Sequence, residues 1–324
     1  MVSQQILNDI NNSSAIRAMF TEGKKLAARV GAENVYDFSL GNPSVPAPAA
    51  VTAALERIIK ETDPVRLHGY TSAQGDTAVR AKIAESIEKR FGFSANKDLI
   101  YMTCGAAASL TVTLNALINS GDEIIIPSPF FPEYRVFAEN AGARVVTVQC
   151  RKPDFQLDIK ATENAVTEKT KAIIINSPNN PTGAVFSPDT IKALSDMLCK
   201  KQAEYGTDIY IIADEPYREL SYGAEVPYIP KYYANTVICY SYSKSLSLPG
   251  ERIGYIFIPE GAADCRKLYA AVCGAGRALG FVCAPSLMQY TVAECTDALP
   301  DVSAYKKNRD LLFGALTDYG YEAV

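Results

Sequence analysis

The sequence predicts an α/β fold built on a mostly parallel sheet of seven strands. Seven strand-like runs follow residue 98, and several of them are apolar throughout instead of alternating between apolar and polar residues. Continuous apolar strands of this kind are buried on both faces of a sheet. Helical or turn-rich segments separate the runs, which is the pattern of parallel strands joined by crossovers. The runs lie at residues 99–103, 123–126, 144–148, 172–176, 208–213, 236–240 and 253–258.

The segments before the first run are predicted to be mainly helical. Apolar residues at helical spacing favour helices over 13–30 and 51–60, with a short strand at 35–38 between them. A further helix carries Val79, Ile83 and Ile87 on one face, and Asp76 or Gly75 is its expected N-cap. After the last strand, a helical segment is expected near 305–316.

Composition restricts the kind of protein. The 324 residues are 48% hydrophobic and 21% charged, enough for one large or two ordinary domains. A formal net charge of -4 gives no electrostatic reason to expect a nucleic-acid or membrane partner. The eight cysteines contain no CxxC pair and there is one histidine, His68, so no metal site is predicted. Without an apolar leader or a bilayer-length apolar run, we expect a cytoplasmic protein with reduced thiols.

Residues suited to ligand binding follow the ends of several strands, and the carboxyl ends of parallel strands meet at one sheet edge. Each has an ordinary structural explanation, such as a turn, a helix start, a core aromatic or a strand-end cap. Their concentration at one edge favours a ligand site. They are Gly105-Ala106-Ala107, Pro129-Phe130-Phe131, Asn180-Pro-Thr-Gly183, Asp214-Glu-Pro-Tyr217 and Ser243-Lys244.

Lys244 is the most informative of these residues. It follows the apolar run at 236–240, and Ser241 and Ser243 stand beside it, with Arg252 eight residues further on. Two hydroxyls, an amine and a guanidinium in so short a stretch form a plausible phosphate site with an amine inside it.

Three motifs together resemble the signature of pyridoxal 5′-phosphate (PLP)-dependent aminotransferases of fold type I, class I/II, the family of aspartate aminotransferase. The similarity also includes Gly41-Asn-Pro43 and Gly69-Tyr70-Thr71, so it extends from about residue 35 onward. The three motifs occur in the family's order: Ser-Pro-Asn179-Asn180-Pro-Thr-Gly, Ala-Asp214-Glu-Pro-Tyr217, and Ser241-Tyr-Ser243-Lys244 with Arg252.

The resemblance implies three catalytic residues. Lys244 would form the Schiff base with PLP and move the substrate proton, which requires a neutral amine that burial and nearby cations favour. Asp214 would pair with the ring nitrogen of PLP and keep it protonated. Tyr217, together with Asn180, would donate to the phenolic oxygen of the ring.

The resemblance also implies the remaining contacts of PLP and substrate. Phe131 would stack on the ring, although a core role for Phe130 or Phe131 remains open. Gly41 would lie against the substrate carboxylate, with Asn180 beside it, and Tyr70 would reach the phosphate from the second subunit of a homodimer. The phosphate would be held within the chain by Gly105, Ala106, Ala107, Ser241, Ser243 and Arg252.

The domain organisation follows from the same resemblance. It implies a large PLP-binding domain at 46–287, with 1–45 and 288–324 forming an N-terminal segment and part of a smaller α/β domain. Relatives continue beyond the position of Val324, and the arginine that binds the substrate α-carboxylate lies in that continuation. We therefore expect the smaller domain to be incomplete here, and no residue is assigned to this role; Arg277 is a weak candidate for a second carboxylate contact.

Three functions fit these observations. The first is an aminotransferase that moves an amino group from an L-amino acid to a 2-oxo acid, with aspartate and 2-oxoglutarate as one candidate pair. The second is a C-S β-lyase, because the same cofactor chemistry serves both reactions. The third is a non-catalytic sensing module like those of some transcriptional regulators. It is disfavoured because such regulators carry a DNA-binding domain ahead of this one, and there is no room for it before residue 35.

Overall fold

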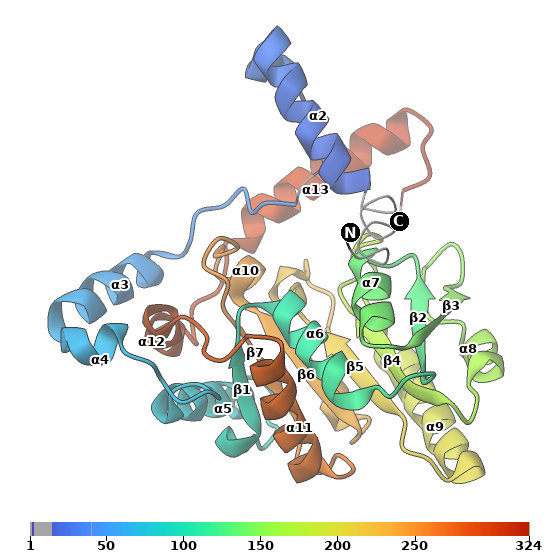
Figure 1. Cartoon of the computed structure of the whole chain (residues 1–324). Coiled ribbons are helices and arrows are strands. Elements are labelled where there is room, and N and C mark those ends of the chain that lie inside the picture. The colour runs from blue at the N-terminus through green and yellow to red at the C-terminus, as the bar shows by residue number, and fades with distance from the viewer. Residues whose placement is uncertain (1, 3–14, 40, 324) are drawn as a thin grey trace.

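A computed structural model describes residues 2, 15–39 and 41–323 of the chain (Figure 1). Its centre is a seven-stranded sheet with the order β1-β7-β6-β5-β4-β2-β3. The seven predicted strands are all present, with ends within two residues of the predicted ones. They are β1 (Ile100–Thr103), β2 (Glu123–Ser128), β3 (Arg144–Gln149), β4 (Thr170–Asn176), β5 (Tyr210–Asp214), β6 (Thr236–Ser241) and β7 (Gly254–Phe257).

Helices cover both faces of this sheet (Figure 1). The α-helices are α2 (Ala15–Val30), α3 (Ala49–Glu61), α4 (Pro64–His68), α5 (Thr77–Phe91), α6 (Ala106–Leu117), α7 (Glu133–Asn140), α8 (Ile159–Ala165), α9 (Pro188–Tyr205), α10 (Tyr242–Ser245), α11 (Cys265–Ala278), α12 (Ser286–Glu294) and α13 (Val302–Asp318). The 3-10 helices are η1 (Ala32–Asn34), η2 (Lys97–Leu99), η3 (Arg218–Leu220) and η4 (Ile229–Lys231).

Two hydrophobic cores lie on opposite faces of the sheet, as the apolar strands require. Side chains alternate along a strand, so Ile125 of β2 enters one core and its neighbours Ile124 and Ile126 enter the other. The first core is closed by α3, α5, α9 and α12, and the second by α6, α7 and α11. Burial on both faces explains why these strands are apolar throughout.

The sheet is mostly parallel, which confirms the predicted fold class. Strands β2 to β6 run parallel to one another, and β7 is antiparallel to both of its neighbours, β6 and β1. Because β7 runs the opposite way, its amino end lies at the edge where the other strands finish. Arg252, two residues before β7, therefore reaches the same edge as Ser243 and Lys244 after β6.

The N-terminal segments agree with the prediction except at one place. Asp76 caps α5 by accepting hydrogen bonds from the backbone N–H groups of Ala78 and Val79. The short strand predicted at 35–38 is wrong: this segment is irregular and follows η1. Tyr36 and Phe38 are each 84% exposed there, and none of the strands in the described part of the chain pairs with the segment. Its β-forming residues therefore have no partner among these strands.

Among the described residues, none of the helices combines the length and the apolar character that a bilayer crossing needs. The division of the chain at 45/46 and 287/288 into a large domain and flanking segments stays a prediction.

Candidate active site

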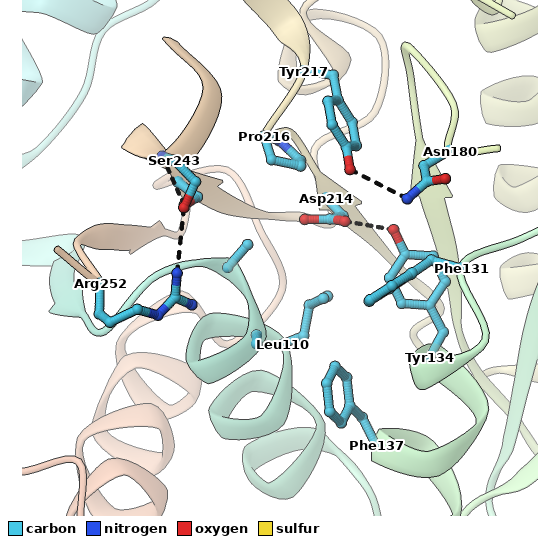
Figure 2. A pocket seen from close by; sticks show the side chains of 13 residues that line it. Leu110, Phe131, Tyr134, Phe137, Asn180, Asp214, Pro216, Tyr217, Ser243 and Arg252 are labelled. Atoms are coloured by element: carbon cyan, nitrogen blue, oxygen red, sulfur yellow. Dashed lines mark hydrogen bonds between the residues drawn. The ribbon is translucent and has the colours of Figure 1, made fainter. Parts of the chain in front are cut away.

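A cavity of about 130 Å³ opens at the carboxyl edge of the sheet, where the sequence places its candidate ligand residues (Figure 2). Nine of the predicted site residues line it. They are Ala106, Ala107, Phe131, Asn180, Asp214, Tyr217, Ser241, Ser243 and Arg252. Strand ends β4, β5 and β6 and the start of α6 thus bring together residues that are up to 146 positions apart in the chain (from Ala106 to Arg252).

One end of the cavity is built to receive an anion. Helix α6 begins there, and no side chain caps its first turn, so its N–H groups are left for a ligand. Gly105, its N-cap residue, has φ of 87°, a conformation that favours glycine. A Cβ at Gly105 would lie 2.9 Å from Nη2 of Arg252, so glycine also lets the guanidinium approach the helix start.

Two serines and Arg252 complete this end of the cavity. Ser241 caps α10 by accepting from the Ser243 N–H, and its hydroxyl lies 2.9 Å from that of Ser243. Nη1 of Arg252 donates to the Ser243 hydroxyl at 3.4 Å (Figure 2). The same atom donates to the Pro249 carbonyl at 2.9 Å. A guanidinium, two hydroxyls and a helix N-terminus form a suitable set of donors for a phosphate dianion.

The other end of the cavity holds a buried carboxylate. Asp214, the last residue of β5, is 4% exposed, and one of its oxygens, Oδ2, accepts a hydrogen bond from the Tyr134 hydroxyl (Figure 2). Its other oxygen, Oδ1, is buried with no hydrogen-bond partner among the residues that the structure describes. Burial raises the pKa of Asp214 to about 7; the Tyr134 hydroxyl opposes the rise and Glu215 adds to it. A cationic or N–H donor in the cavity would satisfy Oδ1.

Tyr217 and Asn180 lie side by side on the wall next to Asp214. The Asn180 amide donates to the Tyr217 hydroxyl at 3.2 Å. Burial and the neighbouring Asp214 raise the pKa of Tyr217, while the Asn180 amide opposes the rise. The Tyr217 phenol therefore stays protonated at neutral pH and can donate a hydrogen bond into the cavity.

Lys244 lies next to the cavity on α10 and is half-buried. Its ammonium donates to the backbone carbonyl of Gly41, which brings the N-terminal segment to the site. Burial, and after it the charge of Arg252, lower the pKa of Lys244. Both causes are the ones predicted from the sequence, and both favour the neutral amine.

Tyr70 is the one predicted site residue that the structure does not bring near the cavity. Its side chain is 99% exposed, so the ring packs against nothing described in its own chain. Arg277, the weak carboxylate candidate, lies on the exposed side of α11 and does not line the cavity.

Sequence reasoning missed three residues that line the cavity, Leu110, Tyr134 and Phe137, and it gave no role to Pro216 within the motif that it named. Tyr134 is the most important, because it contacts Asp214 directly and forms an edge-to-face pair with Phe131, with ring centroids 5.6 Å apart. It lies three residues after Phe131, in the first turn of α7, and its backbone N–H donates to the Phe131 carbonyl at 3.0 Å.

Asp214 also makes the stability of the ligand-free protein depend on pH. Its pKa rises from the ordinary 3.8 to about 7 on folding, so between these values the folded state binds more protons than the unfolded state. The free energy of unfolding should therefore fall as the pH rises from about 4 to about 7. Asp214→Asn should flatten this slope in urea unfolding at several pH values. The exposed Asp208→Asn serves as the control, and an unchanged slope in Asp214→Asn would contradict the assignment.

Comparisons with known proteins agree with this geometry. The family model "Aminotransferase class I and II" matches residues 32–323. The chain is similar to an amino transferase of Eubacterium rectale, with 54% identity, a TM-score of 0.95, and coverage of 99% of this chain and 82% of that one. It is 29% identical to a probable N-acetyl-LL-diaminopimelate aminotransferase of Bacillus subtilis and 28% identical to a probable aspartate aminotransferase of Methanocaldococcus jannaschii. These matches cover 90% and 94% of this chain and 72% and 77% of the relatives. The chain therefore belongs to the class I and II aminotransferase family.

Proposed function

We propose that this protein is a PLP-dependent aminotransferase that moves an amino group from an L-amino acid to a 2-oxo acid. The observation that carries the proposal is one cavity with an anion site at one end and a buried carboxylate, Asp214, at the other. An amine with a lowered pKa, Lys244, stands beside it. The family uses PLP, whose phosphate, pyridine nitrogen and aldehyde require these three partners.

The residues present fit PLP by their own chemistry. Oδ1 of Asp214 is buried without a partner among the described residues, which is unfavourable unless a ligand donor fills the cavity. A protonated ring nitrogen would supply that donor, and its charge would hold Asp214 as a carboxylate in spite of its raised pKa. Tyr134 holds the other oxygen, so the free one remains directed at the ligand.

Each protein group has a defined task in this proposal. Bound PLP supplies an electron sink for the charge that develops at the substrate α-carbon. Lys244 would hold the cofactor at rest and then, as a neutral amine, would move the α-proton of the substrate. Asp214 would stabilise positive charge on the ring nitrogen, and Tyr217 with Asn180 would donate toward the phenolic oxygen. Phe131 would contact the ring.

The phosphate has its own set of partners in the proposal. Ser241, Ser243 and Arg252 provide side-chain donors, and Gly105, Ala106 and Ala107 provide backbone N–H groups at the start of α6. Gly41 would contact the substrate carboxylate, so its hydrogen bond with Lys244 would have to open when substrate binds. The eight cysteines are all free thiols, which fits a reducing compartment such as the cytoplasm.

The identity of the amino donor and of the 2-oxo acid is the most specific part of the proposal. The relatives described above carry names with different amino donors, N-acetyl-LL-diaminopimelate and aspartate, and an aspartate/2-oxoglutarate pair is the first to test. A screen of L-amino acids against 2-oxoglutarate, with glutamate formation as readout, identifies the donor. Release of ammonia and pyruvate from cystathionine without amino transfer would instead identify a C-S β-lyase.

We further propose a homodimer in which Tyr70 completes the phosphate site of the other subunit. Family members are typically dimeric, and the 99% exposure of the Tyr70 side chain leaves its ring free to enter a neighbouring chain. A hydrogen bond to the phosphate is worth about 1.5 to 3 kcal/mol. Tyr70→Phe should therefore weaken PLP affinity by roughly ten- to hundredfold and leave the melting temperature of the PLP-free protein unchanged.

A mixed dimer tests whether the site is shared. The Lys244→Ala chain and a chain with a Tyr70 substitution that is shown to be impaired are unfolded and refolded together. Hybrid dimers with one chain of each kind then form. If Tyr70 acts across the interface, each hybrid holds one site with both residues intact and activity returns. If no activity returns although hybrids are present, Tyr70 does not act from the second subunit. Tyr36→Phe is the control for the Tyr70 variant, because Tyr36 is another highly exposed tyrosine.

A further inference from the structure

Outside the cavity lining, hydrogen bonds of buried side chains connect the segments that carry Lys244 and Tyr217. The hydroxyl of Tyr240 in β6 donates to Oε1 of Glu219 at 3.0 Å and lies 2.9 Å from Oγ of Ser245. Because that hydroxyl has a single proton, Ser245 must be the donor to Tyr240. Arg90 of α5 forms an ion pair with the same oxygen of Glu219. We refer to Arg90, Glu219, Tyr240 and Ser245 as the Tyr240 network.

The Tyr240 network connects two elements of the site. Ser245 directly follows Lys244 in α10, and Glu219 lies in η3, two residues after Tyr217. Helix α10 contacts η3 in the fold. The hydrogen bonds thus join the segment that carries Lys244 to the segment that carries Tyr217, and none of the four residues lines the cavity itself.

Three of the four residues are buried, Arg90 is partly exposed, and the central ring is fixed by packing. Tyr240 and Ser245 are each 3% exposed, and the side chain of Glu219 is also 3% exposed. The Tyr240 ring stacks on Tyr255, with centroids 4.9 Å apart, and meets Tyr242 edge-on at 5.1 Å. Packing therefore holds the ring in place, and loss of the hydroxyl would leave Glu219 and Ser245 each without one partner.

Helix α10 needs such a restraint because it has only four residues, too few to hold a position by its own hydrogen bonds. We propose that the Tyr240 network positions Lys244 for attack on the cofactor aldehyde by fixing α10 through Ser245. In that reaction the neutral amine would form a C=N bond to the aldehyde carbon, and the aldehyde oxygen would leave as water with the two amine hydrogens. The inference rests on the proposed function, since Lys244 is taken as the residue that captures PLP. None of the four residues contacts the cavity, so they act as positioning residues.

Two ligands separate positioning of Lys244 from general support of the pocket. PLP must react with the Lys244 amine, whereas pyridoxamine 5′-phosphate has no aldehyde and binds without that reaction. Tyr240→Phe and Ser245→Ala should each slow covalent capture of PLP, measured by borohydride trapping and mass spectrometry, by on the order of tenfold. The affinity for pyridoxamine 5′-phosphate should stay within about twofold of wild type.

Tyr233→Phe is the matched control. It also removes one buried tyrosine hydroxyl, which donates to the Ile209 carbonyl at 2.6 Å near the opposite edge of the sheet. It should destabilise the fold to a similar degree and leave capture of PLP unchanged. Wild-type capture rates in both network variants would overturn the inference, and so would an equal loss of affinity for both ligands. If wild-type protein does not capture PLP on Lys244, the proposed function fails as well.

Discussion

Lys244→Ala is expected to lower transamination by at least about 10²- to 10⁴-fold, the usual contribution of one positioned acid–base group. The reason is that the Lys244 amine, which follows the cavity-lining Ser243, is half-buried and has its pKa lowered by burial and by Arg252. Steady-state rates with the best amino donor measure the loss. The variant should keep its fold, because the contact that it removes is a single one to the Gly41 carbonyl.

Two further variants make this result specific. Lys244→Arg keeps the length and charge of the side chain, but its guanidinium cannot lose its proton near neutral pH, so it should be as inactive as Lys244→Ala. Lys200→Ala, on the exposed end of α9, should keep full activity. Substantial turnover in Lys244→Arg would contradict the role of a neutral amine at this position.

Asp214→Asn should give the second largest effect, a loss of turnover on the order of 10²- to 10³-fold, comparable to removal of one preorganised electrostatic partner. Asparagine has the shape of aspartate but cannot stabilise a positive charge on the ring nitrogen. PLP should remain bound, because Lys244 and the donors around Arg252 are intact. Equilibrium binding and steady-state rates, measured on the same preparation, separate the two properties.

The control for Asp214→Asn is Asp208→Asn. Asp208 precedes the same strand, β5, but is exposed at its other end, so its replacement should change neither binding nor turnover. If Asp214→Asn turns over at nearly the wild-type rate, Asp214 is only a strand-end residue and the cavity does not need its charge.

The sequence was sufficient to predict the sheet and most of the cavity. Strands that are buried on both faces must be apolar throughout, so their positions can be read directly, and their common carboxyl edge gathers Asn180, Asp214 and Ser243. The placement of Arg252 required one more fact, that β7 runs antiparallel to β6. Strand direction depends on pairing between distant segments, so the sequence of a single strand says little about whether it runs parallel or antiparallel to its neighbours.

Contacts between residues that are far apart in the chain could not be predicted from the sequence, for the same reason. Tyr134 meets Asp214 across 80 residues, and Lys244 meets the Gly41 carbonyl across 203. No local sequence pattern predicts either of these two contacts. The predicted strand at 35–38 failed because β-forming residues indicate only a preference, and a strand exists only where another strand pairs with it.

The most direct test of this account is the site of covalent attachment of PLP. Purified protein is incubated with PLP, reduced with borohydride, digested and analysed by mass spectrometry. The account predicts one pyridoxyl group per chain, located on Lys244, together with a visible absorption band that disappears on reduction. A pyridoxyl group on another lysine, or no bound chromophore after incubation, would contradict it.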